Sequence, residues 1–191
     1  MWVRWSGWTV NRSSPAAEAV LADCKYAGYP RRSCIRQRKV QQSMEDITDQ
    51  VIVQTPVDRV WAAIQDPAEH VKWHPFATHI EGAHALGGTR TCQVLIGGKP
   101  GTTRELCSAY DEARTIMWTV EHDSSGFSRL VSDWRTGFSL QVQGSGATRV
   151  TAQSLFTPKR FLARLMMPVI RRKFHQTQRA ILGGLQQHAE R

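Results

Sequence analysis

Histidines gather in the middle of the chain, at positions 70, 74, 79, 84 and 122. In an apolar pocket a histidine could act as the general base that removes a proton alpha to a carbonyl group. An arginine or tyrosine nearby could then hold the enolate oxygen. His74, within Trp73-His74-Pro75, is the first candidate for such a base. The alternative, which we prefer, is that these histidines are surface residues or have satisfied hydrogen bonds inside the fold.

Charged residues on the expected strands are further candidates for acid or base chemistry, namely Glu105, Glu121, Asp133, Arg104 and Arg135. Asp133 and Arg135 are two residues apart and would share one face of a strand. If Trp134 points inward, both charges face water. A pair of inward charges would instead mark a polar end of a cavity and would need partners.

No metal-ligand spacing stands out, because Pro75 interrupts the segment after His70 and His74 and no third ligand is indicated. The cysteines Cys24, Cys34, Cys92 and Cys107 show no C-x-x-C spacing. Cys92 and Cys107 fall on neighbouring expected strands, where buried reduced thiols are the expectation rather than a disulfide. We therefore expect neither a metal nor a cofactor.

The net charge of +9 is concentrated in the first 43 residues. Residues 1–43 carry eight basic and two acidic residues, whereas the remainder carries 17 and 14. Residues 1–43 are therefore expected to be a basic, disordered extension, and residues 44–191 a single domain, for which nucleic-acid binding is not indicated. The alternative is that this extension tethers the protein to nucleic acid or to an anionic membrane.

No stretch approaches 18 apolar residues, and the start lacks the apolar run of a signal peptide. We expect a cytoplasmic protein with, at most, peripheral membrane contact. The sequence carries no signal of oligomeric state.

The spacing of apolar residues predicts which strands and helices carry these side chains, and in which order the elements follow. A strand from Ile47 ends at Thr55-Pro56, and two short helices follow, separated by Asp66-Pro67. Turn signals then divide a meander into five further runs, Thr89–Ile96, Thr102–Tyr110, Thr115–His122, Phe127–Gln143 and Thr148–Phe156. The short connections predict antiparallel pairing. A long amphipathic helix is predicted from Pro158 to about His188, with a kink near Leu165 caused by Pro168.

This order resembles the helix-grip fold of the START and polyketide cyclase/dehydrase lipid-transport superfamily, also known as SRPBCC. The resemblance covers about Ile47 to His188 and rests on motifs in the family's order. They are Val53-x-x-Pro56-x-x-x-Val60-Trp61, Asp66 with Trp73 and Pro75, Gly87, Gly144-x-Gly146-x-Thr148-Arg149-Val150, and Phe156-x-Pro158. The resemblance implies an α+β domain in which a curved antiparallel sheet wraps around the long C-terminal helix.

The resemblance also implies a cavity between the sheet and that helix. Alternate strand residues and the apolar helix residues would line it, and the candidates for ligand binding are Trp73, Phe76, Val94, Trp118, Trp134, Phe138, Leu165, Met166, Val169 and Ile170. The alternative is that these side chains fill the core completely, since periodicity does not distinguish a lined cavity from a filled one.

The implied function is to bind or carry a hydrophobic small molecule that is lipid-like, aromatic or polyketide-like. The alternative is an aromatase/cyclase or dehydratase that uses a pocket histidine or acid. Members of the superfamily differ in activity on the same fold, so function has to be argued from the site.

Overall fold

The computed structural model describes residues 44–191 except 97, 145 and 160. The expected N-terminal extension and its possible tether role lie outside the described residues. The elements follow in the order β1 (Glu45–Val53), α3 (Val57–Gln65), α4 (Pro67–Trp73), β2 (Ala77–Gly82), β3 (Thr89–Ile96), β4 (Lys99–Asp111), β5 (Thr115–Asp123), the 3-10 helix η2 (Phe127–Arg129), β6 (Val131–Gln143), β7 (Ala147–Pro158), α5 (Phe161–Leu165) and α6 (Met167–Ala189).

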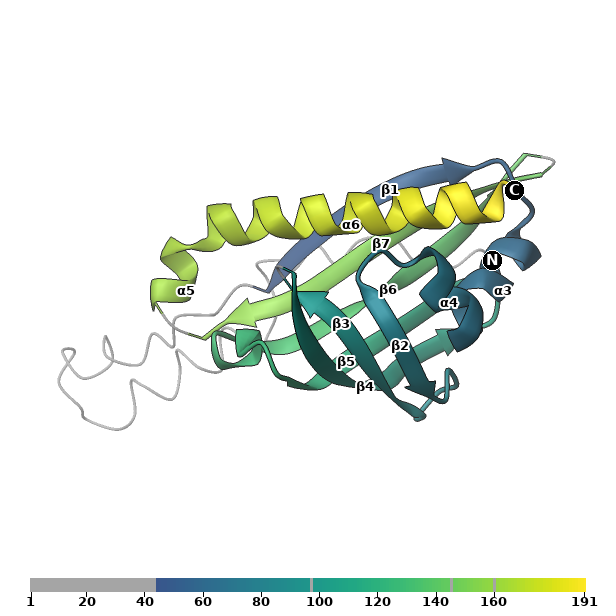
Figure 1. Cartoon of the computed structure of the whole chain (residues 1–191). Coiled ribbons are helices and arrows are strands. Elements are labelled where there is room, and N and C mark those ends of the chain that lie inside the picture. Colours follow the sequence, from purple (N-terminus) through teal and green to yellow (C-terminus); the bar gives the residue numbers. More distant parts are fainter. Residues whose placement is uncertain (1–43, 97, 145, 160) are drawn as a thin grey trace, which may run out of the picture. The chain divides into compact units, whose positions relative to one another are not determined.

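The strands form a seven-stranded sheet in the order β1-β7-β6-β5-β4-β3-β2, and every neighbouring pair is antiparallel. The sheet curves around α6, while α3 and α4 lie near the C-terminal end of that helix (Figure 1). The predicted helix-grip fold is therefore confirmed. Because β1 pairs with β7, the first and last strands of the domain lie side by side, with Glu45 opposite Phe156.

Asp66 and Pro67 separate α3 from α4, as the sequence predicts. The Asp66 carboxylate accepts a hydrogen bond from the backbone N–H of Ala68 at 2.8 Å, which caps α4. Pro67 occupies the first turn, where the missing N–H costs nothing. Asp66 thus ends one helix and begins the next, and α4 is held where it presents His70 to the interior.

Two strand predictions need correction. The short strand β2 has no counterpart among the predicted strands. The run predicted from Phe127 begins instead as η2, and β6 starts only at Val131. The reason lies in Asp123, whose carboxylate accepts hydrogen bonds from the backbone N–H groups of Phe127 and Ser128 and so fixes a turn there.

The predicted kink in the C-terminal helix is confirmed and takes the form of a break. Helix α5 ends at Leu165, and α6 begins at Met167 with Pro168 in its first turn. In that turn proline lacks only an N–H that would have had no helical partner.

Helix α6 approaches α4 closely at a glycine. A β-carbon placed on Gly184 would lie 2.2 Å from the carbonyl oxygen of Trp73, whereas one placed on Gly183 would meet nothing within 4 Å. The absence of a side chain at Gly184 therefore sets the distance between α6 and the helix that carries His70.

These adjacent glycines provide a matched pair of substitutions. We expect Gly184→Ala to lower the free energy of unfolding by about 1–3 kcal/mol, because α4 has to move away. Gly183→Ala should raise it by up to about 1 kcal/mol, because alanine favours a helix. Urea denaturation followed by tryptophan fluorescence measures both changes, and equal effects of the two substitutions would contradict the packing argument.

Candidate functional site

A cavity of about 300 Å³ lies between the sheet and α6. Five of the residues predicted to bind ligand line it, namely Phe76, Val94, Trp118, Trp134 and Phe138. Helix α6 contributes Phe174, Thr177, Gln178 and Ile181. The interior is thus hollow at the place where the sheet and the long helix face each other, and most of its wall is apolar.

The other five predicted ligand-binding residues do not line this cavity. Trp73 is buried against α3, where its indole N–H donates to the carbonyl oxygen of Ala63 at 2.7 Å. Ile170 is buried in a separate cluster with Ile47, Val131, Phe156 and Met167.

Leu165, Met166 and Val169 lie on the outside, with exposed fractions of 69%, 43% and 59%. The prediction placed them inside because nine of the ten residues from 161 to 170 are apolar, with Arg164 as the exception. Such a segment gives no indication of which side faces the sheet.

One end of the cavity is polar and centres on a buried ion pair between Arg90 and Glu105. The guanidinium contacts one carboxylate oxygen through Nε at 2.8 Å and through Nη2 at 2.6 Å. The hydroxyl of Thr103 donates to the other oxygen at 2.8 Å. The guanidinium carbon also lies 3.5 Å from the centre of the Trp118 ring. The ion pair is therefore supported by the Thr103 hydroxyl and the Trp118 ring, and it adds no net charge to the cavity.

The candidates from sequence include Glu105 but neither Arg90 nor Thr103. The alternation of inward and outward residues along the strands could have identified both. Arg90 is two residues before the inward Cys92 and four before Val94, so it faces the same side, and it lies directly opposite Glu105 in the β3–β4 register. A charged residue at an inward position of a strand requires a partner, and the opposite strand supplies it.

His70 lines the cavity, and one of its two ring nitrogens has no hydrogen-bond partner among the described residues. Its Nδ1 lies 3.1 Å from the carbonyl oxygen of Ile64. Because a carbonyl oxygen only accepts, Nδ1 carries the proton and Nε2 keeps its lone pair. Burial, followed by the nearby Arg90 charge, lowers the pKa of His70 well below 6.5, so the ring is neutral at pH 7.

His74 has the opposite arrangement. Its Nδ1 accepts hydrogen bonds from the backbone N–H groups of Ala77 at 2.9 Å and of Phe76 at 3.3 Å. Burial and Arg90 lower its pKa to about 4, so the neutral ring carries its proton on Nε2. The two ring centres are 5.3 Å apart. His74 therefore offers a donor, and the lone pair that a general base requires belongs to His70.

The remaining candidates lie outside the cavity wall or have other partners. His79, His122 and Asp133 are exposed, and Arg104 pairs with Glu121 on the surface. Cys92 and Cys107 are buried free thiols, as expected, and burial raises the pKa of Cys92 to about 11. Within the described part of the chain, no three histidine, cysteine, aspartate or glutamate residues are placed to hold a metal ion.

The curved sheet, the enclosing helix and the cavity between them define a helix-grip protein with an internal cavity. Residues 44–190 match the family described as polyketide cyclase / dehydrase and lipid transport, and the chain belongs to this family. Family and fold together indicate a protein that binds hydrophobic molecules or acts as a polyketide cyclase. None of the curated proteins matches the sequence significantly. No helix in the described residues is long and apolar enough to cross a membrane.

Solved structures with the same fold are distant in sequence. A START superfamily protein from Mycobacterium smegmatis is 15% identical with a TM-score of 0.63, over 76% of this chain and 97% of that one. The Zhui aromatase/cyclase from a Streptomyces species is 19% identical with a TM-score of 0.61, over 78% and 95%. Ginseng major latex-like protein 151 from Panax ginseng is 13% identical with a TM-score of 0.58, over 76% and 97%. At these identities the likeness concerns the fold.

The neutral histidines predict how stability depends on pH. An unfolded histidine takes up a proton near pH 6.5, whereas His74 in the folded protein does so near pH 4. Between these values the unfolded state binds more protons, so the free energy of unfolding falls as the pH is lowered from 6.5 and is unaffected above it. We expect His74 to contribute about 2 kcal/mol to the loss between pH 7 and 4.5.

Urea denaturation at several pH values measures this loss. In His74→Asn the amide oxygen can replace Nδ1 as acceptor but takes up no proton, so stability should depend less steeply on pH. The exposed His79→Asn is the control and should retain the wild-type profile. If His74→Asn also retains it, His74 does not stay neutral in the folded protein over this pH range.

Proposed function

We propose that this protein binds a hydrophobic small molecule, lipid-like, aromatic or polyketide-like, that carries a carbonyl or hydroxyl group at one end. The observation that carries the proposal is the cavity itself, with an apolar wall and one polar end. Ligand sites are typically concave and mostly apolar with a few placed polar groups, and about 300 Å³ is the lower end of their usual size. A molecule of modest size fits such a space.

The polar end selects for an uncharged oxygen group. His74 offers an N–H and His70 a lone pair, so a ligand oxygen could accept from one ring and a hydroxyl could donate to the other. Arg90 is already neutralised by Glu105, so no unpaired positive charge remains there for a carboxylate or phosphate. Affinity would come mainly from burial of the apolar part, at about 25 cal/mol per Å².

Native mass spectrometry of gently purified full-length protein tests this proposal. A hydrophobic molecule that copurifies would support it, whereas a protein that never holds one would argue against both binding and catalysis. The neutral dye N-phenylnaphthylamine is a second probe, because its fluorescence increases in an apolar site. We expect the dye to bind in competition with the copurified molecule.

A cavity-filling substitution locates the binding site. Ala152 is buried in the cavity wall, and Ala152→Leu should weaken dye binding at least about tenfold because the larger side chain takes up ligand space. Ala62→Leu, on the exposed side of α3, is the matched control and should bind like the wild type. Equal affinities of the two variants would place the dye elsewhere.

A second candidate function is enolisation of a bound carbonyl compound, as a cyclase would require. The specific observation is the pair of complementary nitrogens at one end of the cavity. His70 Nε2 could take a proton from the carbon alpha to a carbonyl, while His74 Nε2–H donates to the oxygen that becomes negative. The low pKa of both rings makes His70 a weak base, which is why binding is the first proposal.

Exchange of the alpha hydrogen for deuterium separates binding from catalysis, with the copurified compound as the substrate if it carries a carbonyl. A catalyst should accelerate exchange in D2O, and His70→Asn should lower that acceleration about 100-fold or more. Asparagine keeps an N–H for the Ile64 carbonyl but lacks Nε2, so binding should persist. If the exchange rate is unchanged in His70→Asn, His70 is not the base. If the wild type does not accelerate exchange at all, the protein binds this compound without catalysing enolisation.

A further inference from the structure

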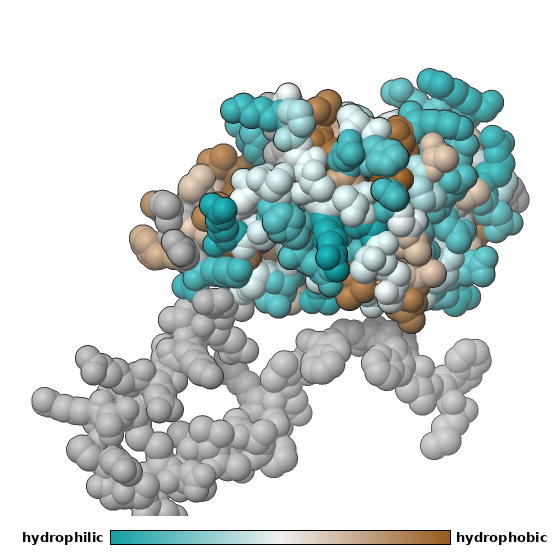
Figure 2. Space-filling model, turned by 60° about the horizontal axis from the view of Figure 1, so that its bottom comes forward, coloured by the Kyte–Doolittle hydropathy of each residue, from teal (hydrophilic) through white to brown (hydrophobic). Residues whose placement is uncertain are grey.

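Exposed large hydrophobic side chains gather at the start of the C-terminal helical segment. Nine such residues are found in the described part of the chain, and four of them, Phe161, Leu165, Met166 and Val169, lie within nine positions. The other five lie apart along the chain, three on different strands and two outside the helices and strands. Figure 2 shows hydrophobic residues at the end of the domain where α5 lies in Figure 1. We call these four residues the α5–α6 patch.

The patch is not a by-product of core packing. The inner side of the same segment already supplies the buried residues Ala163, Met167 and Ile170. The segment is therefore apolar on both sides, whereas the rest of α6 directs polar residues outward. A helix that is apolar all round is normally covered on all sides.

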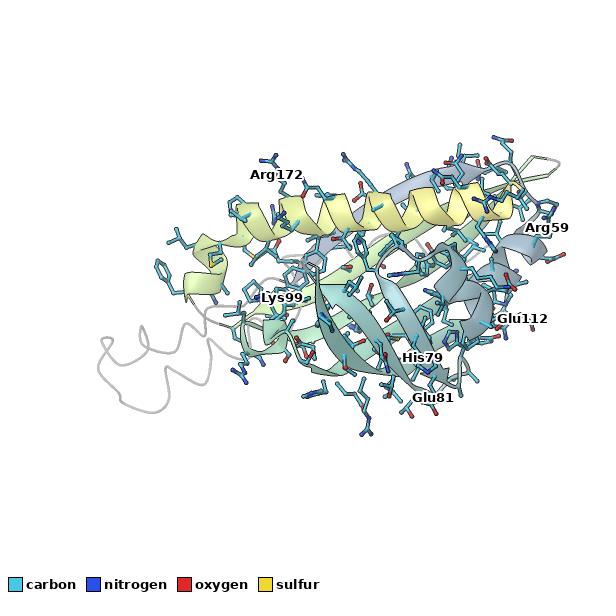
Figure 3. All side chains as sticks on the ribbon, viewed as in Figure 1. Arg59, His79, Glu81, Lys99, Glu112 and Arg172 are labelled. Carbon is cyan, nitrogen blue, oxygen red and sulfur yellow. The ribbon has the colours of Figure 1, made fainter. Side chains whose placement is uncertain are left out.

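Positive charge surrounds the patch. Arg164, Arg172 and Lys173 lie beside it and have no acidic partner among the described residues, and Arg172 projects from the side of α6 that faces away from the sheet (Figure 3). The chain has no aspartate or glutamate between Asp133 and Glu190. Exposed apolar side chains next to cations form a surface that suits the boundary of an anionic bilayer, where the side chains enter the acyl region and the cations face the headgroups.

The charge also argues against the other possible occupants. Residues 1–43 carry eight basic and two acidic residues, so they would bring further positive charge to a cationic surface. A second copy joined patch to patch would bring the same cations together. An anionic lipid surface is the complementary partner.

We propose that the α5–α6 patch docks this protein onto anionic membranes as a peripheral contact. The proposal does not depend on the identity of the ligand in the cavity. In this arrangement, α5 and the first turns of α6 are the parts of the protein that enter the lipid.

Cosedimentation of the full chain with vesicles tests the proposal. We expect binding to phosphatidylcholine vesicles with 30% phosphatidylserine, much weaker binding to phosphatidylcholine alone, and release in 0.5 M NaCl. Binding that is independent of lipid charge, or absent from both vesicles, would overturn the proposal.

Two matched pairs of variants assign the binding to the patch. Phe161→Ser with Leu165→Ser should lower the vesicle partition coefficient about tenfold or more, and the control is Leu86→Ser with Val142→Ser, two exposed residues elsewhere. Arg172→Glu with Lys173→Glu should do the same, and its control is Arg59→Glu with Arg191→Glu.

Residues 1–43 are present in every variant, so tail-driven binding would appear as equal partitioning of patch and control variants and would overturn the proposal. Urea midpoints check that the variants fold. Light scattering after gel filtration reports self-association: a dimer that is lost in Phe161→Ser with Leu165→Ser, with unchanged vesicle binding, would show that a second copy covers the patch instead.

Discussion

A single long helix has to cover the concave face of a seven-stranded sheet. Strands lie about 4.8 Å apart, so seven of them extend over roughly 29 Å, whereas a helix with its side chains is about 10 Å wide. Curvature of the sheet reduces the difference, and α3 and α4 fill part of the remainder. What they leave uncovered is the cavity against Phe138, Trp118 and Val94. The interior is thus hollow because the helices are too narrow to cover the whole concave face of the sheet.

Backbone groups of α3 and of β2 fix the proton positions of two histidines that line this cavity. The carbonyl of Ile64, near the end of α3, fixes the proton of His70 on Nδ1. The backbone N–H of Ala77, at the start of β2, fixes the proton of His74 on Nε2. Two identical side chains four residues apart therefore present opposite hydrogen-bonding groups. Backbone hydrogen bonds therefore determine which hydrogen-bonding groups these two rings offer to a ligand.

The sequence predicted the architecture well because its signals are local and periodic. Asp66-Pro67, Pro168 and the alternation along β3 each act within a few residues, and each prediction agrees with the structure. The cavity wall was harder to predict. From Phe161 to Ile170 the only polar residue is Arg164, too little to orient the segment, so Leu165 and Val169 were placed inside. Arg90 was overlooked because its partner, Glu105, lies on another strand, although the alternation along both strands shows that both residues face inward. The tautomers of His70 and His74 depend on tertiary contacts and could not be read from the sequence.

The pairing of β1 with β7 has a consequence for how the protein is made. Glu45 meets Phe156, and Gln178 of α6 donates to the carbonyl oxygen of Ile47 at 3.0 Å. The strand synthesised first therefore has no partner until almost the whole chain has left the ribosome. Contacts between residues so far apart in sequence slow folding. During that interval the concave face of the sheet lacks its covering helix, so the nascent chain exposes its apolar interior until α6 is synthesised.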